Sequence, residues 1–258
     1  MSDGSTVTHD ATSGAWASMW YAGKRVLVTG GTSGIGAGIA RGFIEAGANV
    51  TVAGVSDAEI AALASDPVLK KANAQLLDVR DISAIKTLIG FFDSLDVVVN
   101  CAGVIRRGDE LDPSVFESVV DINLNGTMRV CATARPLLAQ SKGAIVNLAS
   151  MLSFFGGGLV PGYAASKGGI AQLTKSLAIA YANDGIRVNA IAPGWIATPL
   201  TSALQGNSER SEAILVRTPL GRWGQPSDLL GGVLYLCSPA ASFVTGAVLV
   251  IDGGYAVV

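Results

Sequence analysis

The chain has 258 residues, of which 50% are hydrophobic and 15% are charged, and its formal net charge is -2. This composition is too apolar for a disordered chain and is sufficient to bury a sizeable core. The small negative charge, without any basic cluster, argues against nucleic acid or a membrane surface as a partner. No uninterrupted apolar run reaches the roughly 18 residues that a membrane-spanning helix needs, so a membrane protein is not expected.

The cysteines and the only histidine are too dispersed for a Cys/His zinc site, and no metal is expected. Cys101, Cys131 and Cys237 form an odd, widely spaced set, which indicates reduced thiols and a cytoplasmic protein. His9 falls in residues 1–22, which lack the basic start and apolar core of a signal peptide. We expect an N-terminal tail there; a cloning remnant and a segment lying on a neighbouring subunit both stay open.

After residue 22, short apolar runs alternate with helix-length segments. In chain order, the predicted strands are 25–29, 49–53, 74–77, 97–100, 143–149, 187–192 and 248–251. The longer predicted helices are 35–46, 115–139, 163–182 and 226–237. Continuous apolar strands are typical of parallel sheets covered on both faces. The alternation therefore predicts an α/β fold, a single doubly wound domain over residues 23–258 with about seven parallel strands.

A glycine-rich turn joins the first predicted strand to the first helix. Gly30, Gly34 and Gly36 lie in this turn, where missing side chains would let the backbone approach a pyrophosphate at the helix N-terminus. Glycines also mark ordinary tight turns. Their position after a strand and before a helix favours dinucleotide binding.

The end of the second strand bears on the choice of cofactor. Gly54 stands where NAD enzymes often carry an acidic residue for the ribose 2′-OH, and Val55 stands where a basic residue often follows in NADP enzymes. Ser33 offers no cation for a 2′-phosphate either. The sequence therefore favours NAD over NADP, although Asp57 would have to reach back and Ser56 could bind a phosphate without charge.

Two further strand ends carry candidate ligand contacts. Asp78 and Val79 end the third strand, where the carboxylate could accept a hydrogen bond from an adenine amino group or be an ordinary loop residue. The segment 100–103, Asn-Cys-Ala-Gly, ends the fourth strand at the sheet edge where such folds bind ligands.

Tyr163 and Lys167 begin a predicted helix and share one of its faces. A free tyrosine has a pKa of about 10, and a neighbouring ammonium favours its phenolate. The pair is thus a candidate general acid/base for an alcohol proton, although this spacing is also common on exposed helices. Ser150 ends the fifth strand thirteen residues earlier, so its hydroxyl should emerge at the same edge, which favours the catalytic interpretation.

Together and in this order, these motifs resemble the short-chain dehydrogenase/reductase family over residues 22–258. The matching elements are Thr29-Gly-x-x-x-Gly-x-Gly36, Asn100-x-Ala-Gly103, Asn123, Ser150, Tyr163 with Lys167, and Pro193-Gly194 followed by Thr198. Cys101 departs from the pattern, because the family usually has a second asparagine there. The resemblance implies that Tyr163 moves the proton of the reacting oxygen and that Ser150 orients this oxygen. It also implies that Lys167 binds the nicotinamide ribose and lowers the tyrosine pKa, and that Asn123 holds a water in a proton relay.

The same resemblance implies a set of cofactor contacts and an assembly. The implied cofactor-binding residues are Gly30, Thr32, Ser33, Gly34, Ile35, Gly36, Asp78, Val79, Asn100, Ala102, Gly103, Tyr163, Lys167, Pro193, Gly194, Ile196 and Thr198. The implied assembly is a homotetramer in which helices 115–139 and 163–182 pair between subunits. The residues expected to allow close approach are Ala164, Gly168, Ala171 and Ala178.

A narrower resemblance, in residues 102–107, 147–157 and 222–229, is to the sugar-acid dehydrogenases of the family, those acting on 2-dehydro-3-deoxygluconate or gluconate. Arg106 or Arg107 would suit a substrate carboxylate, although a subunit interface or solvent explains this pair equally well.

Leu152 and Trp195 are further candidate substrate contacts, and residues 194–217 are expected to form a lid. We predict hydride transfer between a secondary alcohol and a ketone, with a sugar acid or polyol as the small-molecule substrate. An NADPH-dependent carbonyl or 3-oxoacyl reductase and a non-catalytic nucleotide-binding regulator are the alternatives.

Overall fold

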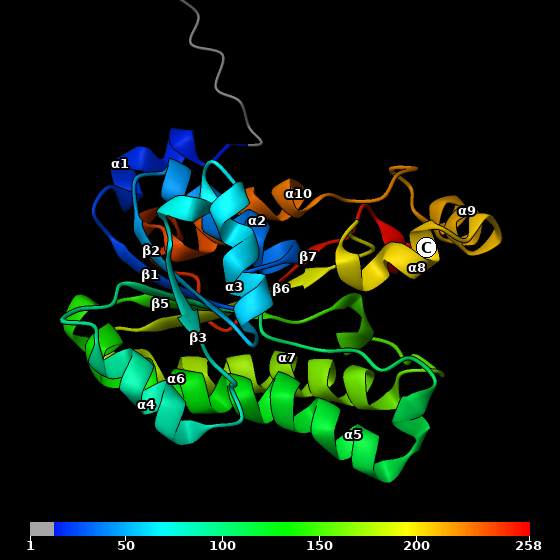
Figure 1. Ribbon diagram of the computed structural model, residues 1–258, viewed down its shortest axis with the longest axis horizontal. Coiled ribbons are helices and arrows are strands. Elements are labelled where there is room, and N and C mark those ends of the chain that lie inside the picture. The colour runs from blue at the N-terminus through cyan, green and yellow to red at the C-terminus, as the bar shows by residue number, and fades with distance from the viewer. Residues whose placement is uncertain (1–12) are drawn as a thin grey trace, which may run out of the picture.

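Seven parallel strands form one sheet in the order β3-β2-β1-β4-β5-β6-β7 in the computed structural model, which describes residues 13–258 (Figure 1). The strands are β1 (Arg25–Thr29), β2 (Asn49–Gly54), β3 (Asn73–Leu76), β4 (Val97–Asn100), β5 (Ala144–Leu148), β6 (Arg187–Pro193) and β7 (Val248–Ile251). The predicted doubly wound parallel sheet is confirmed. The strand order reverses between β1 and β4, and such a switch point opens a crevice at the carboxyl ends of the strands.

Helices cover both faces of the sheet (Figure 1). One face is covered by α1 (Ser18–Tyr21), α2 (Gly34–Glu45) and α10 (Pro226–Cys237), and α3 (Asp57–Ala62) packs beside β2 and β3. The other face carries α4 (Ile82–Gly90), α5 (Pro113–Val120), α6 (Gly126–Ser141) and α7 (Pro161–Tyr181). The short helices α8 (Ser202–Gln205) and α9 (Ser208–Arg217) project beyond the sheet in the segment predicted as a lid.

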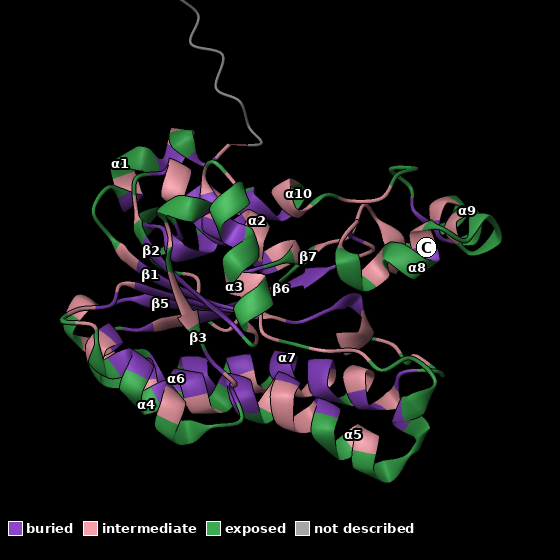
Figure 2. Cartoon of the chain, in the orientation of Figure 1, coloured by how far each residue is buried: buried purple, intermediate pink, exposed green. Residues whose placement is uncertain are grey.

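Two apolar layers sandwich the strands, as the predicted pattern requires. Phe43 of α2 and Leu229 of α10 are fully buried on one face, and Leu138 of α6 is fully buried on the other. Each such side chain stabilises the fold by about 1.5–3 kcal/mol through burial. Figure 2 shows the inner strands and the sheet-facing sides of the helices as buried and the outer helix faces as exposed.

The two edge strands, β3 and β7, correct one expectation. The strands were predicted to be covered on both faces, and these two are not. The residues of β3 are exposed or half-buried, and Leu249 and Val250 of β7 remain 36% and 39% exposed. β3 and β7 are the outermost strands of the sheet, and the helices that cover its faces do not extend fully over them.

The predicted helix 115–139 lies within one continuous helical run that contains an irregular turn. A π-helical turn, Asp121–Asn125, joins α5 to α6. A π turn inserts one extra residue into the helix, and such turns are frequent at functional sites. Here Asn123 bonds to the backbone of Val104, and Gly126 lies so close to Val79 that a Cβ would approach Cγ2 to 2.6 Å. The π turn therefore adapts the helix to the loop after β4.

The small-residue face expected on α7 does not form one open surface. Ala171 and Ala178 are only 9% and 4% exposed within the single chain, because they lie on the side that packs against its own sheet. Gly168 has open space where a side chain would stand.

Part of the predicted tail belongs to the core. Tyr21 packs edge-on against Phe43 with ring centroids 5.0 Å apart, and its hydroxyl donates to the carbonyl of Leu234. The backbone N–H of Gly14 donates to Glu45 at 2.9 Å. Residues 1–12, including His9, lie outside the described residues.

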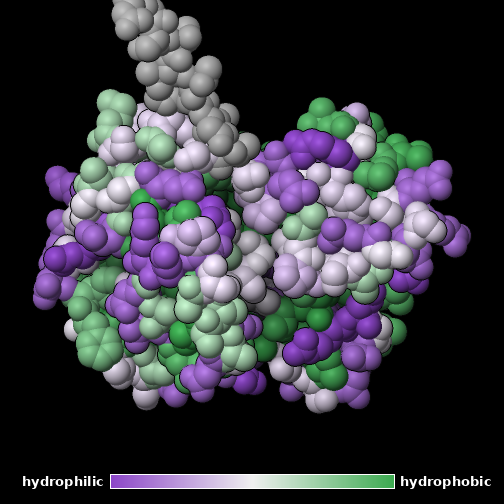
Figure 3. Space-filling view, turned by 45° about the horizontal axis from the view of Figure 1, so that its top comes forward, coloured by the Kyte–Doolittle hydropathy of each residue, from purple (hydrophilic) through white to green (hydrophobic). Residues whose placement is uncertain are grey.

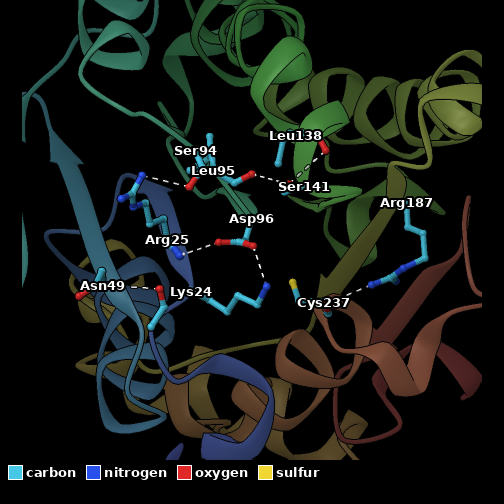
Figure 4. A network of polar contacts seen from close by, with 11 residues as sticks. Lys24, Arg25, Asn49, Ser94, Leu95, Asp96, Leu138, Ser141, Arg187 and Cys237 are labelled. Carbon is cyan, nitrogen blue, oxygen red and sulfur yellow. Dashed lines mark hydrogen bonds and ion pairs between the residues drawn. The ribbon is translucent and has the colours of Figure 1, made fainter.

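A polar network ties the amino ends of the strands together, away from the carboxyl edge (Figure 4). Asp96 accepts from Lys24 Nζ and from the backbone N–H of Arg25, both at 2.9 Å. Arg187 donates to the carbonyl of Cys237 at 3.0 Å, which joins β6 to the end of α10. Within residues 13–258, no helix is long and apolar enough to cross a membrane.

Candidate active site

A cavity of about 490 Å³ lies at the carboxyl edge of the sheet, at the switch point. The glycine turn after β1, the ends of β2 and β3, and the loop after β4 form its walls, and Tyr163, Lys167 and Thr198 complete it. Figure 3 shows the surface hollowed between the part that carries α3 and the part that carries α8 and α9. The candidate residues were predicted to lie at this edge, and most of the predicted cofactor contacts line this one cavity.

The glycine turn packs too closely against its own backbone surroundings to accommodate side chains. A Cβ on Gly30 would lie 2.7 Å from the backbone nitrogen of Ala102, and one on Gly36 would lie 2.0 Å from the carbonyl oxygen of Gly30. Gly30 and Gly34 also have φ values of +62° and +52°, where side chains are disfavoured. The backbone N–H groups and partial positive charge at the start of α2 suit a pyrophosphate. The turn therefore fits a dinucleotide.

Most of the predicted cofactor contacts line the cavity. They are Gly30, Thr32, Ser33, Gly34, Ile35, Gly36, Asp78, Val79, Ala102, Gly103, Tyr163, Lys167 and Thr198. Asp78 is not a free carboxylate, because its oxygens accept from the Arg80 guanidinium at 2.6 and 3.0 Å. This hydrogen bonding holds the pKa of Asp78 below its usual range.

Asn100 is among the predicted contacts that do not line the cavity. Its amide is buried and donates to Asn147 Oδ1 at 2.9 Å, and Asn147 in turn donates to Thr174 Oγ1 at 3.0 Å. This chain of bonds links β4, β5 and α7, so Asn100 stabilises the elements that carry the site without lining the cavity. Its side chain faces inward because its Cβ points to the core face of β4.

The segment after β6 also supports the cavity from behind. Pro193, Gly194 and Ile196 do not line it, and their contact with a cofactor stays a prediction. A Cβ on Gly194 would approach the Cβ of Asp252 to 2.6 Å, so this segment packs tightly against the chain after β7. The close packing fixes the course of the backbone that leads to Thr198, which does line the cavity.

Glu59 is a cavity residue that the sequence reasoning missed. Its Oε2 accepts from Thr32 Oγ1 at 3.1 Å and from the backbone N–H of Val55 at 3.2 Å. The same oxygen lies 3.0 Å from where a Cβ of Gly54 would stand. A carboxylate thus occupies the position left empty at Gly54. The pattern Ser56-x-x-Glu59 resembles a capping box and could have indicated a glutamate that turns back over this loop.

Tyr163 and Lys167 line one end of the cavity, and Ser150 does not line it but contacts Tyr163 from the turn after β5. The Lys167 nitrogen lies 5.5 Å from the centre of the Tyr163 ring. Burial raises the pKa of Tyr163, a hydrogen bond with Ser150 lowers it, and the charge of Glu110 raises it. The net direction is upward, so the expected lowering by Lys167 does not govern this pKa. The reason is that desolvation of the phenolate outweighs the attractive contacts.

Lys167 is nearly fully buried, at 3% exposure, and its ammonium donates to the carbonyl of Leu148 at 2.5 Å. Burial lowers its pKa from 10.5 to about 8. A buried, perturbed lysine beside a cavity is costly to the fold, and such residues concentrate at functional sites.

Two buried side chains hold the loop after β4 against α7. Asn123 Oδ1 accepts from the N–H of Val104 at 2.8 Å, and its Nδ2 donates to Ser166 Oγ at 3.1 Å. Glu110 accepts from the N–H groups of Arg106 and Tyr163, both at 2.7 Å. Glu110 therefore caps the first turn of α7 at Tyr163. No local pattern separates it in the sequence from its exposed acidic neighbours.

None of the predicted substrate residues Arg106, Leu152 and Trp195 lines the cavity. The side chain of Arg106 is exposed and makes no hydrogen bond or ion pair among residues 13–258. Leu152 lies half-buried in the turn after Ser150. Trp195 joins an aromatic cluster, with its ring 5.9 Å from that of Trp223 and 6.3 Å from that of Tyr255. Within the described part of the chain, no group of three or more His, Cys, Asp or Glu side chains could hold a metal ion.

The fold and site define an NAD(P)-dependent oxidoreductase with a dinucleotide cavity at the switch point of a doubly wound sheet. Residues 30–256 match a family model described as enoyl-(acyl carrier protein) reductase. The chain belongs to the short-chain dehydrogenase/reductase family, as the motifs predicted.

Relatives and solved structures match over most of their own length. The chain is 44% identical to the 2-dehydro-3-deoxy-D-gluconate 5-dehydrogenase of Pseudoalteromonas atlantica, over 90% of this chain and 96% of the relative. A structure described as a 2-deoxy-D-gluconate 3-dehydrogenase of Agrobacterium tumefaciens with bound NADP has a TM-score of 0.82 at 41% identity, covering 92% and 98% of the two chains. The gluconate 5-dehydrogenase of Burkholderia cenocepacia, in complex with NADP and tartrate, has a TM-score of 0.86 at 32% identity, covering 95% and 99%.

Proposed function

We propose that this enzyme interconverts a secondary alcohol and a ketone on a sugar acid, with Tyr163 as the general acid/base. The observation that carries the proposal is that Tyr163 and the buried Lys167 line one end of a cavity whose other end is a glycine turn, with Ser150 in contact with Tyr163. The names of the relatives support the substrate class. When bound, the nicotinamide cofactor supplies or accepts the hydride.

The residues of this chain would handle the proton. The Ser150 hydroxyl bonds to the reacting oxygen and orients it beside the Tyr163 phenol. Because burial raises the pKa of Tyr163, the phenol is protonated at neutral pH and can give its proton to the oxygen formed from a ketone. Alcohol oxidation needs the phenolate, which the charge of Lys167 and the bond to Ser150 favour. The rate of oxidation should therefore rise with pH above neutrality, whereas the rate of reduction should not.

We assign Asn123 a supporting role in this proton transfer. Its Nδ2 donates to the Val104 carbonyl and to Ser166 Oγ, and its Oδ1 accepts from the Val104 N–H, so we propose that its π-helical backbone carbonyl holds a relay water. Thr127 Oγ1 already donates one bond to the Asn123 carbonyl at 2.8 Å, and a carbonyl can accept a second.

NAD is the proposed cofactor in preference to NADP, and Glu59 is the supporting residue. Its carboxylate stands beside Gly54, where it can accept from a ribose 2′-OH and would repel a 2′-phosphate. Arg80, which also lines the cavity, is neutralised by Asp78.

Relatives of this chain have been solved with NADP, so a direct measurement is needed. Calorimetric titration should give a lower Kd for NAD than for NADP. Glu59→Gln removes one negative charge and should reduce the ratio of the NADP Kd to the NAD Kd about tenfold. Tighter binding of NADP by the wild-type protein would refute this preference.

A substrate panel at fixed NAD and NADP tests the proposed reaction. We expect sugar acids such as D-gluconate to be oxidised with the highest kcat/KM, followed by polyols. Preference for 3-oxoacyl esters with NADPH would instead support a carbonyl reductase. Tight cofactor binding without turnover of any member would support a regulator.

A homotetramer and a cytoplasmic location complete the proposal. Ile179 of α7 is 80% exposed and Phe243 is fully exposed in the single chain, and apolar side chains of this size favour burial between subunits. Cys101, Cys131 and Cys237 are all free thiols, as in a reducing compartment. Light scattering after size exclusion should give four times the 26.2 kDa chain mass.

A further inference from the structure

An arginine stacked on aromatic rings lies at the same edge as Ser150. Arg217 ends α9, and its guanidinium carbon lies 4.3 Å from the centre of the Tyr255 ring and 5.5 Å from that of Phe155. The Tyr255 and Phe155 rings lie 6.2 Å apart, and Trp195 continues the cluster. The planar guanidinium is held by cation–π contacts, which leave its N–H groups along the edge available.

The topology places this cluster beside the reacting centre. Phe155 lies five residues beyond Ser150 after β5, Trp195 follows β6, and Tyr255 follows β7. Because these strands are parallel and adjacent, their carboxyl ends lie side by side. The cluster and Ser150 therefore follow neighbouring strands at the same edge of the sheet.

Arg217 differs from Arg80 and Arg222 in its charge balance. Arg80 is paired with Asp78, and Arg222 is paired with Asp228 at 2.7 Å. Arg217 makes no ion pair among residues 13–258; its one polar contact is with the Tyr255 hydroxyl at 3.5 Å. A phenol does not neutralise a guanidinium, so this charge can accept an anionic partner.

The position of Tyr255 is itself fixed. Asp252 accepts from the N–H groups of Gly254 and Ala256 at 2.9 and 2.7 Å, and these bonds shape the turn that carries the ring. Arg217 thus stacks on an aromatic ring whose position is set by this turn, although α9 itself lies in the projecting segment. Such preorganisation reduces the entropy lost when a ligand binds.

We propose that Arg217 binds the carboxylate of the substrate and so selects sugar acids over neutral polyols. This inference rests on the proposed function and replaces Arg106, whose guanidinium has no contact that would direct it to the crevice. Arg217 acts on binding, so its loss should raise KM for a carboxylated substrate and leave kcat nearly unchanged.

The test compares D-gluconate with the neutral polyol D-glucitol, which lacks the carboxylate. Arg217→Met should raise KM for D-gluconate about tenfold and change KM for D-glucitol less than twofold, since one charge-assisted contact is lost. Arg217→Lys should restore part of the affinity, because it keeps the charge but not the stacked plane. Arg210→Met, an exposed arginine on the same helix, is the matched control and should behave as wild type.

The outcomes separate the two proposals. Equal losses on both substrates would overturn the inference, because they would show that Arg217 only supports the fold of α9 or the aromatic cluster. Wild-type enzyme that oxidises neither substrate would refute the proposed function instead, and binding of D-gluconate by calorimetry would then still test Arg217. Unchanged gluconate affinity of Arg217→Met in that titration would overturn the inference as well.

Discussion

Replacing Lys167 by methionine should change how the stability of the protein depends on pH. The Lys167 residue is 3% exposed, and burial lowers the pKa of its ammonium from 10.5 to about 8. Below pH 8 the lysine is charged in both the folded and the unfolded states, so the folded state bears the whole cost of burying the charge. Between the two pKa values the unfolded chain binds more protons, and the free energy of unfolding therefore rises with pH.

The magnitude follows from these two pKa values. Relative to Lys167→Met, which has no charge to bury, the wild-type protein should gain about 2.5 kcal/mol of unfolding free energy between pH 7 and pH 10. The lost hydrogen bond to Leu148 adds an offset that does not depend on this titration, so the change with pH isolates the buried charge. Urea denaturation of the cofactor-free proteins, followed by tryptophan fluorescence at several pH values, measures it.

The control is Lys175→Met, two turns further along the same helix, where the side chain is exposed. Its stability should run parallel to that of the wild type across the whole range. If Lys167→Met also runs parallel, the lysine is not buried as a charge and the reasoning fails.

Other variants test separate parts of the site. Gly36→Ala should abolish cofactor binding in a titration, because the new Cβ would meet a carbonyl oxygen at 2.0 Å and displace the turn; retained affinity would contradict the role of the turn. Glu110→Gln should lower the free energy of unfolding by about 2 kcal/mol, because both carboxylate oxygens accept backbone N–H groups and an amide offers only one acceptor. The same variant should also lower kcat by loosening Tyr163; a stability loss with unchanged kcat would separate Glu110 from catalysis.

The features that sequence reasoning predicted well are those whose partners are close in the chain. The glycine turn joins a strand to its own helix, and Tyr163 and Lys167 share one helical turn. Strand positions followed from continuous apolar runs, and the exceptions were the edges of the sheet. The π turn within helix 115–139 was missed because it is stabilised by Asn123 contacting a loop about twenty residues away, which no periodicity reveals.

Residues whose role depends on distant contacts were missed for the same reason. Glu110 meets Tyr163 across 53 residues, and Arg217 meets Tyr255 across 38. Asn100 is a different case. Its motif lies at the predicted strand end, but its own side chain turns toward Asn147 in the core. A motif therefore located the site, whereas packing decided which of its side chains reach the cavity.

The most direct test of the central claim is the turnover of Tyr163→Phe, which loses only the phenolic oxygen. We expect kcat for alcohol oxidation to fall at least about 100-fold, while the Kd for NAD stays within about twofold of the wild-type value. Tyr181→Phe, on the same helix but remote from the cavity, should keep wild-type turnover. Turnover of Tyr163→Phe within a few-fold of wild type would contradict the assignment of Tyr163 as the general acid/base.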